Sequence, residues 1–302
     1  MRDHPQWKAY GALGAVCLFW GTTYLAIRMA LESFPPQTLV AARYLISGVL
    51  MVGASLAMGV RLPTGKNLWR TAGNGLLILG VGNGGLVAAE QWIPSGLAAL
   101  FITTQPFWMV GFEALAPDGE RLHAPTIAGM CVGFLGVGLL AAQGGLTGGS
   151  AAAVTAGFLV LQVACAGWSA GSILQRRMGL DTHPVVNGAV QQLATGIVFM
   201  IPALAMKGPA IHWSAKGVGA VLYLVVFGTI VGFSAYSYAL SNLPVAVTSI
   251  YTYINPVVAV SLGWLFYREP FGMREAMGMM VIFVGVAIVK RYGHGGLSPR
   301  RS

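Results

Sequence analysis

The sequence predicts an all-α membrane protein, with ten transmembrane helices arranged as two inverted five-helix repeats. Three observations predict this class. Hydrophobic residues make up 56% of the chain and charged residues only 9%. Apolar windows of about 20 residues, the length that crosses a bilayer, follow one another along the chain. The second half of the chain also repeats features of the first half at an offset of about 149 residues.

The composition excludes a soluble protein. A soluble domain carries roughly 25% Asp, Glu, Lys and Arg, whereas these 302 residues include only 9 acidic and 18 basic side chains. The net charge of +9 indicates no nucleic-acid partner, because the basic residues stand singly or in pairs between apolar runs. Cys17, Cys131 and Cys165 form neither a zinc spacing nor a disulfide framework. The indicated partner is the lipid bilayer, and we expect no metal and no cofactor.

Clusters of Pro, Gly and charged residues divide the chain into the predicted spans. The spans of the first half are 9–30, 36–59, 71–91, 95–116 and 123–143. Those of the second half are 152–174, 184–206, 217–239, 245–267 and 273–290. The joints after the third and the eighth span are a few residues long, so the helices on either side of each joint must be antiparallel.

The distribution of basic residues predicts the orientation. With a cytoplasmic N-terminus, twelve of the 18 Lys and Arg residues fall on the cytoplasmic side and five on the outer side, while Arg43 lies within a span. Cytoplasmic loops carry an excess of Lys and Arg. We therefore expect a multi-pass protein of the cell (inner) membrane with both termini in the cytoplasm.

Matching residues in the two halves predict the repeat. The matches include Pro94 with Pro244, Gly96 with Ala246, Gln105-Pro106 with Asn255-Pro256, Glu120 with Glu269, and Trp20 with Trp168. Each half has five spans, an odd number, so the second copy enters the membrane from the opposite side. Inverted repeats of this kind are typical of transporters. The predicted repeats are 1–148 and 149–302, joined by the glycine-rich residues 144–150.

Several short runs resemble the EamA family of the drug/metabolite transporter superfamily. They are WGTTY (20–24), ARY (42–44), VGNG (81–84), AEQ (89–91), PSG (94–96) and a Glu-x(8)-Gly-x(6)-Gly-Val pattern in both halves. The first half is most similar to the YedA-like branch. The resemblance covers nearly the whole chain. The chain departs from a strict pattern at Leu240, which replaces the acid that would match Glu90.

The resemblance implies ten helices and the export of small metabolites, often amino acids or amphipathic compounds. It also implies a central cavity lined by helices 1 to 4 and 6 to 9, with helices 5 and 10 at the periphery. The first of the resembling runs places Tyr24 among the candidate cavity residues.

Three ionisable residues fall within predicted spans, where each needs a partner or a wet cavity. Arg43 and Glu90 lie near the outer ends of helices 2 and 3. There they either form an ion pair across a vestibule or reach separately to the interface. Asn83 precedes Glu90 by two helical turns, so both are expected on one cavity face. Glu113 is interpreted as an interfacial carboxylate.

Glu90 is also the candidate for proton coupling, because removal from water disfavours the charged form of a carboxylate. Pro106 and Pro256 stand near the middle of helices 4 and 9, where each removes a backbone hydrogen bond and is expected to act as a hinge. The polar residues beside these prolines become candidate substrate contacts: Thr103, Gln105, Tyr253 and Asn255.

Aromatic residues inside the predicted spans complete the candidate cavity. Trp20 and Trp168 occupy matching places in helices 1 and 6, and Tyr236 lies in helix 8. Paired aromatic walls around an apolar substrate and ordinary core packing are both compatible with these positions. Gly129 and Gly133 in helix 5 have the spacing of a helix contact, which fits either a homodimer through helices 5 and 10 or an internal joint.

The sequence thus predicts a secondary transporter that exports small metabolites by alternating access around a midplane cavity. No Walker loop is present, so ATP does not power it. A G-x-S-x-G string at 167–171 has no histidine in any span to partner it, so we expect no enzyme and no catalytic residue. Two alternatives stay open: a facilitator or exchanger of polar solutes, and a non-transporting membrane scaffold.

Overall fold

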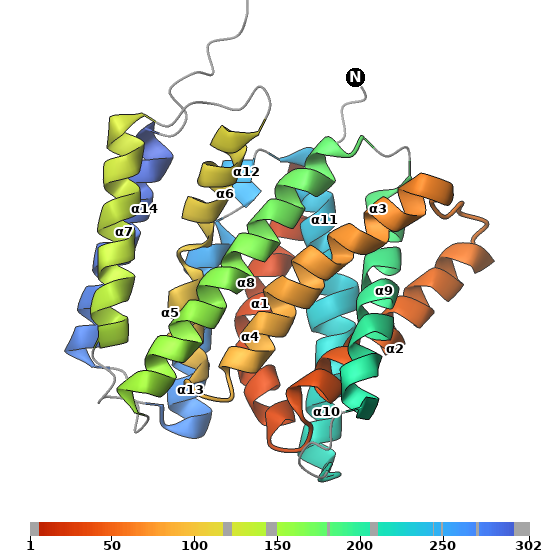
Figure 1. Ribbon diagram of the computed structural model, residues 1–302, viewed down its shortest axis with the longest axis horizontal. Helices are drawn as coiled ribbons and strands as arrows, with labels where there is room; N and C mark the ends of the chain where they lie inside the picture. The colour runs from red at the N-terminus through yellow and green to blue at the C-terminus, as the bar shows by residue number, and fades with distance from the viewer. Residues whose placement is uncertain are drawn as a thin grey trace, which may run out of the picture.

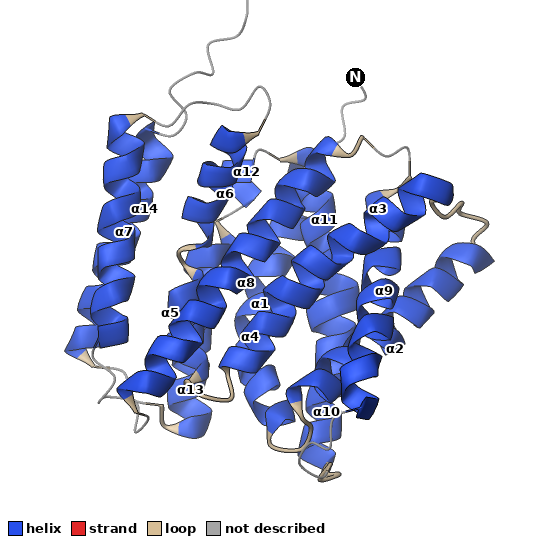
Figure 2. Cartoon of the chain, in the orientation of Figure 1, coloured by secondary structure: helices blue, strands red, loops and turns tan. Residues whose placement is uncertain are grey.

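The structure, a computed structural model, is built of helices that run up and down the molecule (Figures 1 and 2). It describes residues 6–116, 123–142, 150–179, 182–205, 211–243, 245–248, 250–269 and 272–292. The described residues contain no β-strand. Residues 144–149 of the predicted linker and Glu120, which matches Glu269, lie outside this part of the chain.

The elements of the first half are, in chain order, α1 (Gln6–Leu31), α2 (Pro36–Ala57), α3 (Gly65–Gly75), η1 (Leu76–Asn83), α4 (Gly84–Ala89), α5 (Ser95–Ile102), α6 (Gln105–Leu115) and α7 (Ala124–Ala142). Those of the second half are α8 (Ala151–Arg177), α9 (Pro184–Ala205), α10 (Ala215–Tyr223), η2 (Leu224–Val231), α11 (Gly232–Asn242), α12 (Val245–Thr248), α13 (Tyr251–Tyr267) and α14 (Met273–Tyr292). Six helical stretches of the described chain are long and apolar enough to cross a membrane. They correspond to the first, second, third, sixth, seventh and eighth predicted spans.

The helices alternate in direction. In Figure 1, α1 descends from the end of the molecule that holds the N-terminus, and α8, the corresponding first helix of the second half, ascends. We refer to the end at which α1 finishes and α10 begins as the lower end, as it is drawn in Figure 1. At this end the Ser33 carbonyl accepts a hydrogen bond from the His212 N–H.

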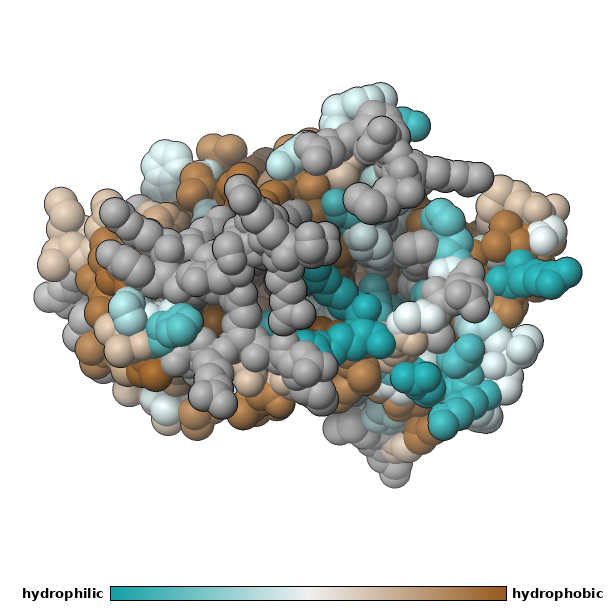
Figure 3. Space-filling view, turned by 90° about the horizontal axis from the view of Figure 1, so that it is seen from above, coloured by the Kyte–Doolittle hydropathy of each residue, from teal (hydrophilic) through white to brown (hydrophobic). Residues whose placement is uncertain are grey.

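The exterior of the bundle is apolar. Large apolar side chains with exposed fractions above 60% include Val163, Ile201, Leu204 and Trp264. Seen from the upper end, hydrophobic residues form the visible flanks, while hydrophilic residues gather on the end face (Figure 3). Exposure of such apolar flanks to water would be unfavourable, so the flanks are suited to contact with lipid. The all-helical membrane fold predicted from composition is therefore confirmed.

The fourth predicted span is interrupted rather than kinked. α5 ends at Ile102 and α6 begins at Gln105, which places Pro106 in the first turn of a new helix. Proline is tolerated there because its missing N–H would have had no partner. The Thr103 and Thr104 hydroxyls donate to the carbonyls of Leu100 and Phe101, at 2.5 and 2.9 Å, and so satisfy the end of α5. Pro256, by contrast, lies inside α13, downstream of the short α12.

Two π-helical segments occur at matching places in the two halves. η1 begins at Leu76 and η2 at Leu224, an offset of 148 residues. In a π-helix each N–H bonds to a carbonyl five residues back, which changes the face presented by the following residues. At the end of η2 the Gly232 N–H donates to the Phe227 carbonyl. Such segments are frequent at functional sites.

α2 packs along α9 through reciprocal glycine contacts. A Cβ atom at Gly48 would lie 2.5 Å from the Leu193 backbone nitrogen, and one at Gly196 would lie 2.5 Å from the Leu45 nitrogen. Gly48 and Gly196 are 148 residues apart in the sequence. Small residues allow the two backbones to approach closely, which is a common means of helix association in membranes.

α7 packs along α14 at one side of the bundle (Figure 1). A Cβ atom at Gly129 would lie 2.8 Å from the Gly285 carbonyl oxygen, and one at Gly285 would lie 2.4 Å from the Gly133 nitrogen. The glycine spacing of the fifth predicted span therefore serves an internal joint. A homodimer through helices 5 and 10 would have to use other faces of α7 and α14.

Candidate functional site

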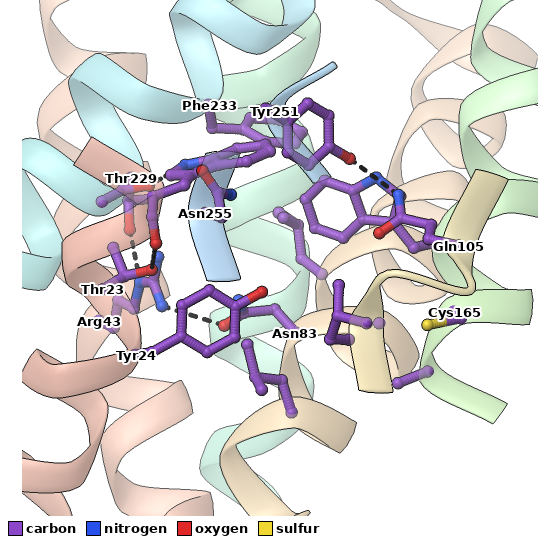
Figure 4. Close-up of a pocket in the computed structure, with 18 of the residues that line it drawn as sticks. Thr23, Tyr24, Arg43, Asn83, Gln105, Cys165, Thr229, Phe233, Tyr251 and Asn255 are labelled. Carbon is purple, nitrogen blue, oxygen red and sulfur yellow. Dashed lines mark hydrogen bonds between the residues drawn. The ribbon is translucent and has the colours of Figure 1, made fainter. Parts of the chain in front are cut away.

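A cavity with about 620 Å³ of empty space lies among helices from both halves of the chain (Figure 4). Part of this space is open to the surroundings of the bundle. Its lining comes from α1, α2, η1, α4, α5, α6, α8, η2, α11 and α13. The lining residues are Trp20, Thr23, Tyr24, Arg43, Tyr44, Leu79, Gly82, Asn83, Leu86, Ile102, Gln105, Ala164, Cys165, Trp168, Gly228, Thr229, Phe233, Tyr251 and Asn255.

One wall of the cavity is aromatic. The Trp20 ring lies edge-on to Trp168 and Tyr251, with ring centroids 5.3 and 5.2 Å apart. Tyr236 lies behind them, 5.0 Å from Trp20, and its hydroxyl bonds to Ser172 at 2.8 Å. These are favoured edge and tilted arrangements of aromatic pairs. The wall is therefore a packed cluster whose inner faces remain available to an apolar ligand.

Glycines at the π-helical segments make room for the two tryptophans. A Cβ atom at Gly232 would lie 2.5 Å from Trp20 Nε1, and one at Gly82 would lie 3.0 Å from Trp168 Cε3. The Trp20 indole donates to the Gly228 carbonyl within η2, at 3.0 Å. Each tryptophan thus rests on the π-helical region of the other half of the chain.

The opposite part of the cavity holds Arg43, which is 3% exposed. Its Nε donates to the Thr229 hydroxyl at 2.6 Å, and its Nη1 donates to the Asn83 side-chain oxygen at 3.0 Å (Figure 4). The guanidinium also lies 5.2 Å from the Tyr44 ring centroid. None of the described residues that line the cavity is an acid, so the cavity wall has one positive charge and no negative charge.

Polar side chains from the interrupted helices face the remaining side. The Gln105 amide donates to the Tyr251 hydroxyl at 2.8 Å. The Asn255 amide nitrogen, as oriented by its hydrogen bonds, reaches the carbonyls of Tyr251 and Cys17 at 3.2 and 3.1 Å. Cys165 of α8 completes this side, close to Gln105 in Figure 4. Interruption of the helices therefore places amide and hydroxyl groups at the cavity.

Glu90 is buried but does not line the cavity. It follows the last residue of α4, about 10 Å further along the helix axis than Asn83. Asn83 lines the cavity and Glu90 lies two helical turns beyond it, so the expected cavity face extends to Asn83 but not to Glu90 among the residues that line the cavity. The ion pair with Arg43 is not formed. Instead the Arg28 guanidinium donates to the Glu90 backbone carbonyl at 3.3 Å, and both carboxylate oxygens of Glu90 lack hydrogen-bond partners.

A second buried carboxylate, Glu269, closes the lower end beside Glu90. It accepts hydrogen bonds from the N–H groups of Ser95 and Gly96, at 3.0 and 2.9 Å, and from the Ser95 hydroxyl at 2.8 Å. Ser95 and Gly96 begin α5, where unpaired N–H groups and the helix dipole favour a negative charge. This contact joins the loop after α13 to the first half of the chain.

Seven of the predicted cavity residues line the cavity: Trp20, Tyr24, Arg43, Asn83, Gln105, Trp168 and Asn255. Besides Glu90, three others do not. The Thr103 hydroxyl is used by its own helix, and Tyr236 stands behind Trp20. Tyr253 points to α14, with its ring centroid 5.9 Å from that of Phe283.

The most informative residues that the sequence reasoning missed are Tyr251 and Thr229. Because α13 begins at Tyr251, residues 251 and 255 share one helical face, and Tyr253 falls on the opposite one. The structure, in which α13 begins at Tyr251, shows which of these helical faces lines the cavity. Thr229 did leave a signal, since it is a lone hydroxyl within the apolar run of residues 224–233.

Glu113 lies away from the cavity, as interpreted from the sequence. It pairs with Arg177 at 2.8 Å, and both side chains are partly exposed. None of the described residues that line the cavity comes from α7, α9 or α14. The resemblance had implied a lining role for helix 7, to which α9 corresponds, and a peripheral place for the other two.

Comparison with known proteins gives a consistent result. The EamA-like transporter family matches the chain twice, over residues 7–142 and 155–291. The chain is 35% identical over 292 residues to the uncharacterized inner membrane transporter YedA of Escherichia coli K12, covering 96% of this chain and 92% of the relative. It is 26% identical to a probable terminal-alkyne amino-acid exporter of Streptantibioticus cattleyicolor, covering 94% of each. A solved crystal structure shares the fold, with a TM-score of 0.69 at 24% identity over 93% of this chain and 95% of the other.

Proposed function

This chain belongs to the EamA-like transporter family, and from that premise we propose that it exports small metabolites across the inner membrane by alternating access. One observation supports the proposal above all others. The aromatic and polar cavity is built from both halves of the chain, so a movement of one half against the other would change its access. The amino-acid exporter among the relatives supports export and a small amphipathic substrate.

The proposed architecture is ten membrane helices in two inverted repeats, 1–148 and 149–302. Several matched features support it. The family matches each half separately, the π-helical segments recur at an offset of 148 residues, and α1 and α8 run in opposite directions. The pairing of α2 with α9 and of α7 with α14 joins corresponding helices. Both termini are proposed to be cytoplasmic, on the basic residue count.

The proposed energy source is the proton gradient, with Glu90 as the carrier. A carboxylate that is buried without a hydrogen-bond partner is more stable with its proton bound. Glu90 lies at the lower end, which the proposed topology assigns to the outer side. Proton uptake and release there would be linked to movement of the contacts around α5.

Transport from sealed liposomes tests this function. The purified protein is reconstituted in vesicles preloaded with labelled amino acids and amphipathic drugs, and release is followed with and without an imposed pH gradient. We expect gradient-dependent release of a few compounds above the leak of protein-free vesicles. Absence of release under every gradient by folded protein would contradict the proposal and favour a membrane scaffold.

A facilitator of polar solutes such as sugar phosphates is the second candidate. A phosphate group requires more than one cation or a nest of N–H donors for tight binding. Arg43 is the single cation among the described residues that line the cavity. The lining therefore favours a singly charged substrate over a phosphorylated one.

A further inference from the structure

We propose that Arg43 binds the carboxylate of the transported molecule, so that the substrates are small monocarboxylates with an apolar or aromatic body. This inference rests on the proposed transport function and specifies its substrate class. Amino acids with uncharged side chains fall within the class. Amines without a carboxylate, amides and phosphate esters fall outside it.

Arg43 has no acidic counter-charge among the described residues that line the cavity. A buried cation is stable only when it is paired or well hydrogen-bonded. Arg43 is 3% exposed, and its two hydrogen bonds go to the neutral groups of Thr229 and Asn83. The ion pairs found in the described part of the chain are those of Arg177 with Glu113 and of Lys216 with Glu32. The structure thus leaves a positive charge at the cavity without an acid beside it.

The Arg43 guanidinium has N–H groups that the described residues do not use. A guanidinium has five N–H groups, and Arg43 uses one on Nε and one on Nη1. The other N–H groups, including both on Nη2, have no acceptor in the part of the chain that the structure describes. Two parallel N–H groups match the two oxygens of a carboxylate.

Gly228 of η2 lies beside the Arg43 guanidinium. A Cβ atom at Gly228 would lie 2.9 Å from Thr23 Cγ2 and 3.0 Å from Arg43 Nη2. Glycine at this position therefore makes room for the guanidinium beside η2. The Gly228 carbonyl does not compete for the Arg43 donors, because it accepts from Trp20.

The rest of the cavity suits the uncharged part of a substrate molecule. Figure 4 places Arg43 and Asn83 on one side, with Phe233 and Tyr251 on the other. The Trp20 and Trp168 rings extend the apolar side. An amine of an amino acid would meet aromatic faces there, which attract cations weakly. A second acidic group would find no second cation in the described lining.

The test compares pairs of probes that differ only in the carboxylate. 3-Phenylpropionate is compared with 3-phenylpropanamide, and phenylalanine with phenylalaninamide. Wild-type protein, Arg43→Gln and Arg43→Lys are reconstituted in vesicles, and protein-free vesicles give the passive leak. Binding is measured in parallel by quenching of tryptophan fluorescence in detergent, with Arg177→Gln as the control that removes an arginine outside the cavity.

We expect wild-type protein and Arg177→Gln to prefer each acid over its amide by about tenfold or more. Arg43→Gln should reduce that ratio towards one, and Arg43→Lys should retain part of it, because lysine keeps the charge and loses the paired donors. A purely structural role of Arg43 would lower transport of acid and amide equally. An acid-to-amide ratio that is unchanged in folded Arg43→Gln overturns the inference.

Transport and binding readouts separate this inference from the proposed function. If wild-type protein exports other compounds but binds acids no better than amides, the inference is wrong and the transporter stands. If acids bind through Arg43 but nothing is exported under any gradient, the inference stands and the transport function fails. Should Arg43→Gln not fold, Gly228→Ala provides the second variant. Its Cβ would crowd both Thr23 Cγ2 and Arg43 Nη2, and it should weaken binding of each acid more than binding of its amide.

Discussion

Glu90 has an environment unlike that of the other acids whose side chains the structure describes. It is 1% exposed, its carboxylate oxygens have no hydrogen-bond partner among the described residues, and its backbone carbonyl accepts from Arg28. Glu269 is also buried, but its oxygens are held by the start of α5. Glu269 therefore joins two segments, and the proposed proton carrier is Glu90.

We therefore predict that Glu90→Gln abolishes the effect of a pH gradient on transport while leaving binding of substrate largely intact. Glutamine keeps the shape of a protonated glutamate and cannot release the proton. The measurement is substrate release from vesicles with and without the gradient. Glu113→Gln, which alters an exposed acid, serves as the control. Full gradient dependence in Glu90→Gln would remove Glu90 from the mechanism.

Glu32 provides a pH-dependent contact at the lower end of the bundle. Burial alone would raise its pKa, but hydrogen bonds from Lys216 and Tyr267 outweigh that effect, so the pKa of Glu32 lies below its ordinary value. Lys216 Nζ lies 2.9 and 2.8 Å from the two oxygens, and the Tyr267 hydroxyl also donates to the carboxylate. The contact joins α1, α10 and α13.

A lowered pKa in the folded state means that the ionised form stabilises the protein. The stabilisation is present above the unfolded pKa of about 4.3 and is lost as the pH falls through the folded value. We predict that Glu32→Gln lowers Tm slightly at pH 7 and that the difference disappears in acid below about pH 4. Thermal unfolding in detergent measures it. A difference from wild type that is the same at pH 7 and in acid would show that the charge of Glu32 is irrelevant.

At the scale of elements, the π-helical segments and their glycines determine where the two tryptophans lie. Replacing Gly232 by alanine would place a Cβ atom 2.5 Å from Trp20 Nε1. We predict that Gly232→Ala displaces Trp20, breaks its bond to the Gly228 carbonyl and lowers substrate affinity by about tenfold. Gly219→Ala is the matched control, because no atom lies within 4 Å of its added Cβ. Equal affinities of the two variants would contradict the assigned role of Gly232.

The interrupted helices supply the second prediction at this scale. Pro106 lies in the first turn of α6 and Pro256 lies within α13, and each follows a residue that lines the cavity, Gln105 and Asn255. Pro106→Ala and Pro256→Ala should favour continuous helices and slow the conformational cycle more than they weaken substrate binding. Turnover is compared with binding affinity for each variant. A large loss of affinity with normal turnover would mean that the prolines shape the site rather than its movement.

The long spans were predictable because their apolar windows are bounded by Pro, Gly and charges. The interruptions were not. A proline in the sequence is compatible with either a kinked helix or a broken one. Here the helix is broken, and the Thr103 and Thr104 hydroxyls bond to the last carbonyls of α5. The π-helical segments likewise left no distinct pattern in the sequence. Asn83 lines the cavity, whereas Glu90 lies two helical turns further along the axis, a depth that the sequence pattern does not reveal.

At the scale of the whole molecule, the two halves exchange contacts in a symmetric way. Trp20 rests on Gly232 and Trp168 rests on Gly82, while Glu269 of the second half caps α5 of the first. In the proposed alternating-access cycle, reciprocal contacts of this kind would let the two halves rock while they keep a shared interface. The repeat that predicts this symmetry was visible in the sequence from matching prolines and tryptophans. The cavity between the halves required the packing of the side chains.

Alternating access of the cavity is the central claim, and Cys165 allows a direct measurement. This native cysteine lines the cavity, and Cys17→Ala with Cys131→Ala leaves it as the single thiol of the chain. A small, charged, membrane-impermeant thiol reagent is added to one side or the other of sealed vesicles that contain protein of known orientation. We expect that Cys165 reacts from both sides and that a transported compound slows both reactions. Reaction from one side only, with the cavity shown to be accessible after detergent is added, would contradict it.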